Sequence, residues 1–306
     1  MRSSRNLLKS AFSTVFRAGQ NLGFDVLPRH FYSEIPHISK LRRADHWKKP
    51  FSMIGVRGKE IDTQLSFVRE TIPSQLREQL SAGAIYKHAC ERNGEPGFGE
   101  IEALFLYAFI CTHQPARIIQ IGCGVSTAVC LAAAAFAGYK PDIICIEPYP
   151  NKFLTSAAAE GGITLKPVPV ETLDLGFLAF LRKNDLFFVD STHTLGPAGE
   201  VSRIVLEMLP RLPEGAFVHF HDVMFPYDYA GNILNGDLFF WHESVLLHAF
   251  LAFNERFSIL ASLSMLHYAA SDELKAIIKL YSPQKRDEGL SISDGHFPSS
   301  IYLKVN

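Results

Sequence analysis

The chain has 306 residues, 47% of them hydrophobic, and its 30 Lys and Arg against 31 Asp and Glu leave a net charge of −1. This composition excludes a disordered protein, and the length suits one large α/β domain with a smaller appendage. The near-neutral charge gives no global field that would recruit nucleic acid. The positive charge is concentrated in residues 1–49, where ten Lys and Arg stand against three Asp and Glu.

Hydropathy and cysteine usage limit where the protein works. The most apolar windows, residues 103–111 and 128–137, are about half the length that a membrane-spanning helix needs. The five cysteines form no C-x-x-C pair and mostly lie in apolar segments, as small hydrophobic side chains do in a reducing compartment. We therefore expect a cytoplasmic protein without a transmembrane segment.

The N-terminal part is basic and irregular. Residues 3–18 place apolar side chains at helical spacing among arginines and lysines, which predicts an amphipathic basic helix. Such a helix could pack on its own domain, join two subunits of a homo-oligomer, or contact a membrane surface peripherally. The N-G-E-P-G segment, residues 93–97, reads as a linker. We therefore predict an extension or cap over residues 1–93 and a second domain over residues 94–306.

The second domain alternates strands and helices. Strands are predicted at 117–121, 142–146, 163–168, 185–190, 215–221, 257–264 and 300–305. Helices are predicted at 100–112, 126–137, 151–159, 171–182, 198–209, 241–253 and 272–281, and an earlier one at 61–80 is interrupted by Pro73. This order is typical of an α/β fold with a parallel sheet and helices on both faces.

The R-I-I-Q-I-G-C-G-V-S-T-A-V stretch, residues 117–129, joins the first strand to the next helix. Gly122 and Gly124 allow a sharp turn, and Ser126 or Thr127 can cap the helix. Unpaired N–H groups and the positive end of the helix dipole then face a ligand. A Gly-x-Gly turn serves dinucleotides, S-adenosylmethionine (SAM) and purely structural turns alike.

Polar residues follow three further strands. Glu147 ends the second strand, D-S-T-H (Asp190 to His193) ends the fourth, and His221 and Asp222 end the fifth. In open α/β sheets these carboxyl ends share the edge where ligands bind. Glu147 there suits the ribose hydroxyls of SAM or NAD.

The residue types at this edge predict methyl transfer to oxygen. Asp190, His221 and Asp222 could hold a divalent ion that lowers the pKa of a substrate hydroxyl. His193 would take the proton as a neutral imidazole. The resulting alkoxide would attack a methyl sulfonium in line. Further on, Trp241, His242 and Glu243 begin a predicted helix, with a packing role and a substrate role equally open.

The motifs I-I-Q-I-G-C-G-V-S-T, I-C-I-E-P, L-F-F-V-D-S-T-H, H-F-H-D and the final S-I-Y-L-K-V strand resemble the class I SAM-dependent methyltransferases. The likeness is greatest to a bacterial branch with D-S-x-H followed by H-x-H-D. It implies a Rossmann-like seven-stranded sheet with an antiparallel last strand. It also implies a cofactor site at Gln120, Gly122, Gly124, Ser126, Thr127, Glu147 and Asp190.

The D-x-x-H and H-D pairs are similar to those of metal-dependent O-methyltransferases that act on catechols and macrolide sugars. By that likeness Asp190 and Asp222 are Mg²⁺ ligands and His193 is the catalytic base. Two positions depart from the family: Gln120 stands where an acid is usual, and His221 replaces a carboxylate with an imidazole, a poor Mg²⁺ ligand.

We therefore predict a SAM-dependent O-methyltransferase acting on a small hydroxylated acceptor, with a sugar or glycan precursor favoured. Two alternatives stay open. An NAD-dependent oxidoreductase fits the glycine turn and Glu147, although Thr127 stands at the third glycine position of the dinucleotide pattern. A non-catalytic SAM-fold binding or scaffold protein fits the replacement at Gln120.

Overall fold

The computed structural model describes residues 2–81, 83–229, 233–234, 239–285 and 294–306. It divides the chain into two compact units, residues 1–44 and 45–306. We predicted a domain boundary after Asn93, whereas the division falls after Ala44. Residues 45–93 therefore belong to the same unit as the sheet.

The first unit contains α1 (Arg2–Asn21) and α2 (Ile38–Leu41). The helix predicted over residues 3–18 is α1. Several large apolar side chains of this unit are exposed, among them Phe31 at 87% and Tyr32 at 75%. Over residues 10–44, whose side chains the structure describes, this unit therefore buries little apolar surface. Among the residues that the structure describes, no helix is both long enough and apolar enough to cross a membrane.

The second unit is built on one seven-stranded sheet of order β3-β2-β1-β4-β5-β7-β6. Its strands are β1 (Arg117–Ile121), β2 (Asp142–Ile146), β3 (Thr164–Lys166), β4 (Leu186–Val189), β5 (Phe217–Phe220), β6 (Phe257–Ser262) and β7 (Ile301–Val305). Only β7 runs antiparallel, against β5 on one side and β6 on the other. The predicted fold class, with its antiparallel last strand, is confirmed.

Both faces of the sheet are buried, which explains why its strands are almost continuously apolar. Successive residues of β1 point to opposite faces, so Ile118 joins one hydrophobic cluster and Ile119 the other. The first cluster packs against α3 (Ile61–Thr71), α4 (Ser74–Ser81), α5 (Ala84–Asn93), α6 (Glu100–His113), α7 (Val125–Phe136), α8 (Lys152–Ala159), α11 (Leu263–Ala269) and α12 (Ser271–Ile277).

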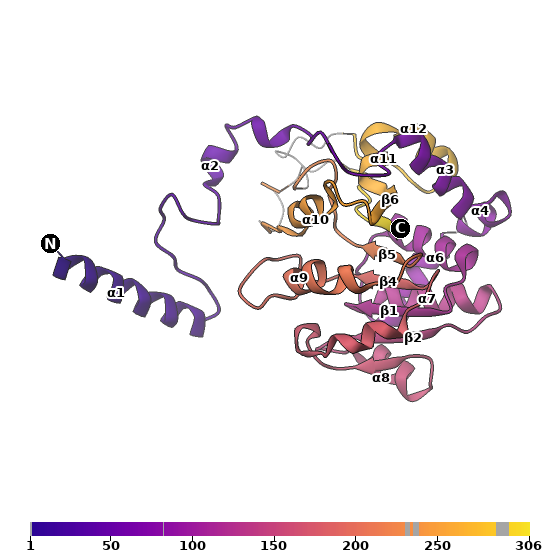
Figure 1. Ribbon diagram of the computed structural model, residues 1–306, viewed down its shortest axis with the longest axis horizontal. Coiled ribbons are helices and arrows are strands. Elements are labelled where there is room, and N and C mark those ends of the chain that lie inside the picture. Colours follow the sequence, from indigo (N-terminus) through magenta and orange to yellow (C-terminus); the bar gives the residue numbers. More distant parts are fainter. Residues whose placement is uncertain (1, 82, 230–232, 235–238, 286–293) are drawn as a thin grey trace. The chain divides into compact units, whose positions relative to one another are not determined.

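The second cluster packs against shorter helical segments. These are η2 (Val170–Thr172), η3 (Leu175–Phe180), η4 (Ile204–Met208), η5 (Leu209–Arg211) and α10 (Glu243–Leu251). The short helix α9 (Glu200–Arg203) comes directly before η4 in the chain. The single short helical turn η1 (His46–Lys48) precedes them in the chain. In Figure 1, α8 lies beside β2 toward one end of the sheet, whereas α10 and α11 lie toward β6 at the other end.

Three predicted elements differ from the structure. The helix predicted at 171–182 is instead two separate 3₁₀ segments, because the Asp174 side chain accepts a hydrogen bond from Gly176 N (2.7 Å) and starts a new turn. The helix predicted at 198–209 is α-helical only over α9 and continues as the π-helical η4. The last predicted strand before the C-terminal one ends at Ser262, whose side chain caps α11 by accepting from Met265 N.

Residues before α3 are tied to the sheet by buried polar contacts. Ile259 N, in β6, donates to Arg57 O (2.9 Å). Gln64 is fully buried, and its side chain donates to Gly58 O (3.0 Å) while it accepts from Ser262 N (2.9 Å). These bonds satisfy polar groups that burial would otherwise leave unpaired. They explain why residues 45–93 form one unit with the sheet.

Gly58 allows this close approach, and replacing it provides a test of the packing. It has φ +76°, and a Cβ there would lie 2.0 Å from Ile259 O. We expect Gly58→Ala to lower the free energy of unfolding by about 3 kcal/mol, measured by urea denaturation, because backbone must move and the left-handed conformation is strained. Gly138→Ala is the matched control.

Gly138 has a similar φ of +71° but nothing within 4 Å of an added Cβ. Its substitution should therefore cost only the conformational strain, about 1 kcal/mol. Equal effects at the two positions would contradict the packing of residues 45–93 against β6.

Candidate active site

The glycine turn after β1 brings the ends of three strands together. Gly122 has φ +78°, and a Cβ there would lie 1.8 Å from the carbonyl oxygen of Asp190. Gly122 N donates to Ile146 O (3.1 Å), and Asp190 N donates to Ile121 O (2.8 Å). Only glycine fits this close approach. The carboxyl ends of β1, β2 and β4 therefore meet at one place.

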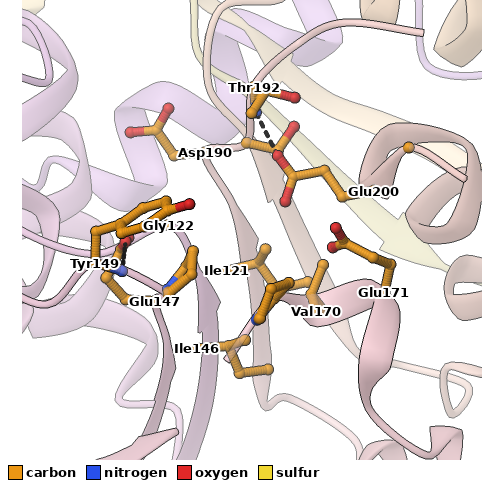
Figure 2. A pocket seen from close by; sticks show the side chains of 14 residues that line it. Ile121, Gly122, Ile146, Glu147, Tyr149, Val170, Glu171, Asp190, Thr192 and Glu200 are labelled. Carbon is orange, nitrogen blue, oxygen red and sulfur yellow. Dashed lines mark hydrogen bonds between the residues drawn. The ribbon is translucent and has the colours of Figure 1, made fainter. Parts of the chain in front are cut away.

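A cavity of about 460 Å³ opens at this place, within the range of small-molecule sites. Four carboxylates line it: Glu147 after β2, Glu171 in η2, Asp190 after β4 and Glu200 in α9. Figure 2 shows Glu147 across the cavity from Glu171 and Glu200. No Lys or Arg is among the lining residues, so the cavity favours a ligand with positive charge or hydrogen-bond donors.

Glu147 is held by the backbone beside this cavity. Its carboxylate accepts from Tyr149 N (2.9 Å) and from Cys123 N (3.3 Å), which lies within the glycine turn. These bonds fix the side chain at the edge where the sequence places a ribose.

Three residues predicted to bind the cofactor, Gly122, Glu147 and Asp190, line the cavity. The other four lie outside its wall. Gln120 is fully buried on the α7 face, where its amide contacts the sulfurs of Cys130 and Cys145. Thr127 caps α7 by accepting from Gly124 N (3.3 Å), and Ser126 is buried beside it. The cofactor contacts predicted for these residues therefore have no counterpart in the cavity wall.

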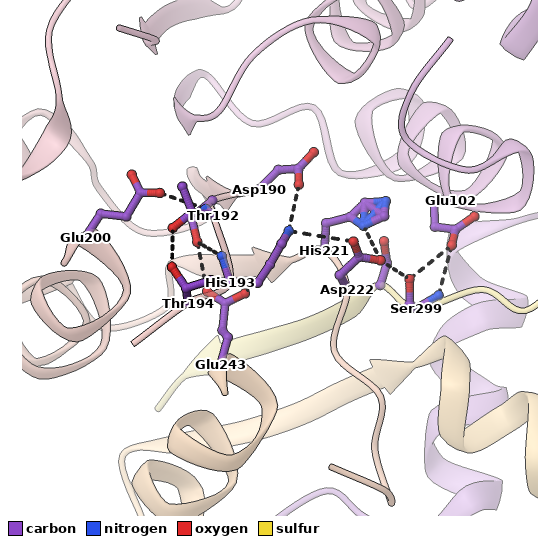
Figure 3. Close-up of polar contacts among 12 residues, drawn as sticks. Glu102, Asp190, Thr192, His193, Thr194, Glu200, His221, Asp222, Glu243 and Ser299 are labelled. Atoms are coloured by element: carbon purple, nitrogen blue, oxygen red, sulfur yellow. Dashed lines mark hydrogen bonds and ion pairs between the residues drawn. The ribbon is translucent and has the colours of Figure 1, made fainter. Parts of the chain in front are cut away.

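His193 is the centre of a group of carboxylates (Figure 3). Its Nε2 lies 3.6 Å from Asp190 Oδ1 and 3.6 Å from Asp222 Oδ2. Its Nδ1 donates to Glu243 Oε2 at 2.6 Å. The parallel pairing of β4 with β5 places Asp190 and Asp222 on the same edge. The sequence brings the first two acids to His193, and the start of α10 supplies the third.

This environment changes the protonation of His193. Burial acts to lower its pKa, but the carboxylates of Asp190 and Glu243, with Asp222, outweigh burial and raise the pKa to about 10. Asp190 responds in the opposite direction. Burial acts to raise its pKa, yet His221 and His193 lower that pKa to about 2. The raised pKa favours the imidazolium form of His193 in the ligand-free protein, so the neutral imidazole predicted to act as the base forms only after that proton is lost.

A second buried polar cluster adjoins Asp222. Asp222 Oδ1 accepts from Ser299 Oγ (2.8 Å) and lies 3.1 Å from His221 Nδ1. The buried Glu102, in α6, accepts from Ser299 N (2.9 Å). Burial acts to lower the pKa of His221, but Asp190, Asp222 and Glu102 raise it. The three acids around His221 therefore favour its protonated form.

The donor set does not fit the Mg²⁺ ion predicted on Asp190, His221 and Asp222. His193 Nε2 lies between the two aspartates at 3.6 Å from each, and imidazole is a poor ligand for this hard cation. Across the described ranges of the chain, no group of three or more His, Cys, Asp or Glu side chains is arranged to hold a metal ion. The imidazole of His193 bridges the carboxylates in place of a metal.

The sequence did not assign Glu243 to the site, since its pattern left a packing role and a substrate role equally open. Glu243 is 1% exposed and begins α10, 50 residues after His193. An acid in the first turn of a helix is also a common capping feature. The position of Glu243 in the sequence therefore does not distinguish a helix cap from a residue of the site. Trp241, whose ring lies 4.6 Å from that of His193, belongs to the site as well.

Part of the chain matches a known protein family. Residues 119–223 match a family model described as a methyltransferase domain. This segment runs from β1 to just after Asp222 and so includes the glycine turn, Glu147 and His193. Together with the sheet order, the match indicates the class: these residues are similar to the core of a methyltransferase domain.

Individual relatives are distant. An uncharacterised protein of Archaeoglobus fulgidus is 28% identical over 190 residues, which cover 58% of this chain and 80% of that protein. The Podospora anserina methyltransferase PaMTH1, solved with S-adenosylhomocysteine (SAH), is 17% identical, with 80% of this chain and 94% of that chain covered and a TM-score of 0.38. The plantazolicin methyltransferase BpumL, also with SAH, is 12% identical, with coverages of 81% and 97% and a TM-score of 0.40. At these TM-scores neither structure bears on the acceptor.

The charge state of His193 can be measured directly. We expect its ring signals in an NMR titration of the ligand-free protein to stay those of an imidazolium from pH 6 to 8, because the folded pKa is about 10. His267 is the internal control: burial lowers its pKa to about 4, so it stays neutral over the same range.

The raised pKa of His193 also makes the stability of the folded protein depend on pH. Because the folded pKa of His193 is raised above 6.5, its contribution to stability is complete below pH 6.5 and is lost as pH rises through about 10. A His193 midpoint near 6.5 would contradict the role given to the three carboxylates.

Proposed function

We propose that the protein transfers a methyl group from SAM to a hydroxyl of a small, uncharged acceptor, with a sugar or glycan precursor favoured. The observation that carries the proposal is the buried His193, whose Nε2 faces the space between Asp190 and Asp222 at the edge of the acidic cavity. The free cysteines of the protein support our proposal that it works in the cytoplasm.

The cavity suits the cofactor in size and charge. Its four carboxylates attract a sulfonium cation, and Glu147 can accept hydrogen bonds from ribose hydroxyls. The absence of a side chain at Gly122 leaves backbone at the wall, where a ligand can approach closely. When bound, SAM supplies an electrophilic methyl group, and SAH is the second product.

His193 acts on the acceptor. In its neutral form Nε2 takes the proton of the acceptor hydroxyl as the oxygen bonds to the methyl carbon. His193 must first lose the proton that the carboxylates hold on it. A cation in the cavity beside Asp190 opposes the imidazolium charge and so lowers the pKa of His193. Cofactor binding and activation of the base are thereby coupled.

The acid groups also select the acceptor. Asp190 and Glu200 line the cavity, and Asp222 lies 3.6 Å from His193 Nε2, so we expect an anionic acceptor to be repelled. Trp241 and the exposed Phe239 stack with ring centroids 5.4 Å apart beside His193. A flat apolar surface of this kind supports a ring-shaped acceptor, such as a sugar, that also offers a hydroxyl.

Cofactor binding is tested by calorimetric titration with SAH. We expect Glu147→Ala to raise the Kd at least tenfold, because the charged hydrogen bonds to the ribose are lost. Glu160→Ala, an exposed substitution just after α8, should leave the Kd unchanged. Adding Mg²⁺ or EDTA should change neither value. Binding of NADH in place of SAH would instead favour the oxidoreductase alternative.

The base is tested by turnover with a panel of neutral sugars. We expect His193→Ala to lower kcat by about 10²- to 10⁴-fold while the Kd for SAH stays near that of the wild type. In the wild type with saturating SAM, log(kcat/KM) for the acceptor should rise by about one unit per pH unit below the pKa of His193 in the SAM complex and level off above it, since only neutral His193 accepts a proton. That pKa should lie below the value of about 10 in the ligand-free protein. Unchanged turnover in the variant would remove His193 from the mechanism.

A further inference from the structure

Glu243 is a buried carboxylate whose two oxygens both serve the segment that carries the base. Oε2 accepts from His193 Nδ1 at 2.6 Å, and Oε1 accepts from Ser191 Oγ at 3.2 Å. At 1% exposure Glu243 is among the most deeply buried acids described. A buried carboxylate needs partners of this kind, and here its partners lie within the D-S-T-H motif.

The backbone of α10 holds the same residue. His242 N and Glu243 N both donate to His193 O, at 3.0 and 3.3 Å. His193 has φ +60°, a left-handed conformation that is uncommon for residues other than glycine. Such a conformation persists where the surroundings fix it. The start of α10 therefore holds both the main chain and the ring of His193.

A neutral imidazole carries one proton, and the partner of each ring nitrogen decides where that proton stays. At Nε2 two carboxylates, Asp190 and Asp222, compete for it from 3.6 Å. At Nδ1 a single carboxylate, Glu243, holds it from 2.6 Å. The shorter contact keeps the proton on Nδ1. Nε2 then has the free lone pair and faces the acceptor side of the site.

We propose that Glu243 is the positioning residue of this reaction: it retains the Nδ1 proton of His193 and fixes the ring, so that Nε2 is the nitrogen that accepts the hydroxyl proton. This role rests on the proposed methyl transfer. It assigns to the first residue of α10 a function that a helix cap alone would not have.

The kinetic experiment uses Glu243→Gln in the full-length protein. The amide has nearly the same shape, but it can present N–H to Nδ1 and so favour the tautomer with the proton on Nε2. We expect kcat to fall about 10²- to 10³-fold while the KM for SAM and for the acceptor changes less than threefold. Glu243→Asp, which keeps the charge on a shorter side chain, should recover about tenfold of that loss.

Glu255→Gln is the matched control because Glu255 is exposed and lies outside the site; its kcat and KM should equal those of the wild type. A kcat for Glu243→Gln within twofold of the wild-type value would overturn the proposal. So would a joint loss of SAH binding and thermal stability, because that pattern marks a purely structural role.

A measurement on the ligand-free protein separates this proposal from the proposed function. With ¹⁵N-labelled histidine, the Nδ1 proton of His193 should appear as a downfield signal typical of a short hydrogen bond to a carboxylate. That signal should persist in Glu255→Gln and move upfield or disappear in Glu243→Gln. Its absence from the wild type would overturn the positioning role. Its presence in a protein that methylates no hydroxyl would refute the reaction but leave the Glu243–His193 pair intact.

Discussion

The candidate site depends on one buried imidazole surrounded by three carboxylates. Glu243 lies 2.6 Å from one nitrogen of His193, and Asp190 and Asp222 lie 3.6 Å from the other. Removing the positive charge would leave three acids facing one another in a largely buried volume, which is strongly unfavourable. The imidazolium therefore holds the ends of β4, β5 and α10 together as well as placing a proton-transfer group beside the cavity.

The fold makes this arrangement possible through close backbone contacts. β4 lies in register between β1 and β5, so the residues after each strand leave the sheet at the same height. The turn at Gly122 then admits the carbonyl of Asp190 where any other side chain would collide with it. The ends of neighbouring strands thus place most side chains of the candidate site. Glu243 and Trp241 come instead from the start of α10 and the residues before it.

The sequence predicted the parts of this structure that depend on local pattern. The seven strands and the convergence of Glu147, Asp190, His193 and Asp222 follow from buried runs and from parallel strands sharing an edge. The antiparallel direction of β7 follows only from the resemblance to class I methyltransferases. Contacts between distant segments could not be read in this way. The pairing of Glu243 with His193 spans 50 residues. A different limit applies to the two 3₁₀ segments that replace one predicted helix: there a local side-chain bond at Asp174 overrides the helical pattern.

The imidazole of His193, with its raised pKa, lies where the sequence analysis predicted a metal site. Two aspartates at one sheet edge need a positive partner, and a divalent ion and a protonated histidine both satisfy that requirement. In the proposed reaction the sulfonium of SAM loses its positive charge as the methyl group leaves, and His193 gains one as it takes the acceptor proton. The positive charge thus moves from one side of Asp190 to the other. The carboxylates that stabilise the cofactor before transfer stabilise the imidazolium after it, so these fixed acids serve both ends of the reaction without rearranging.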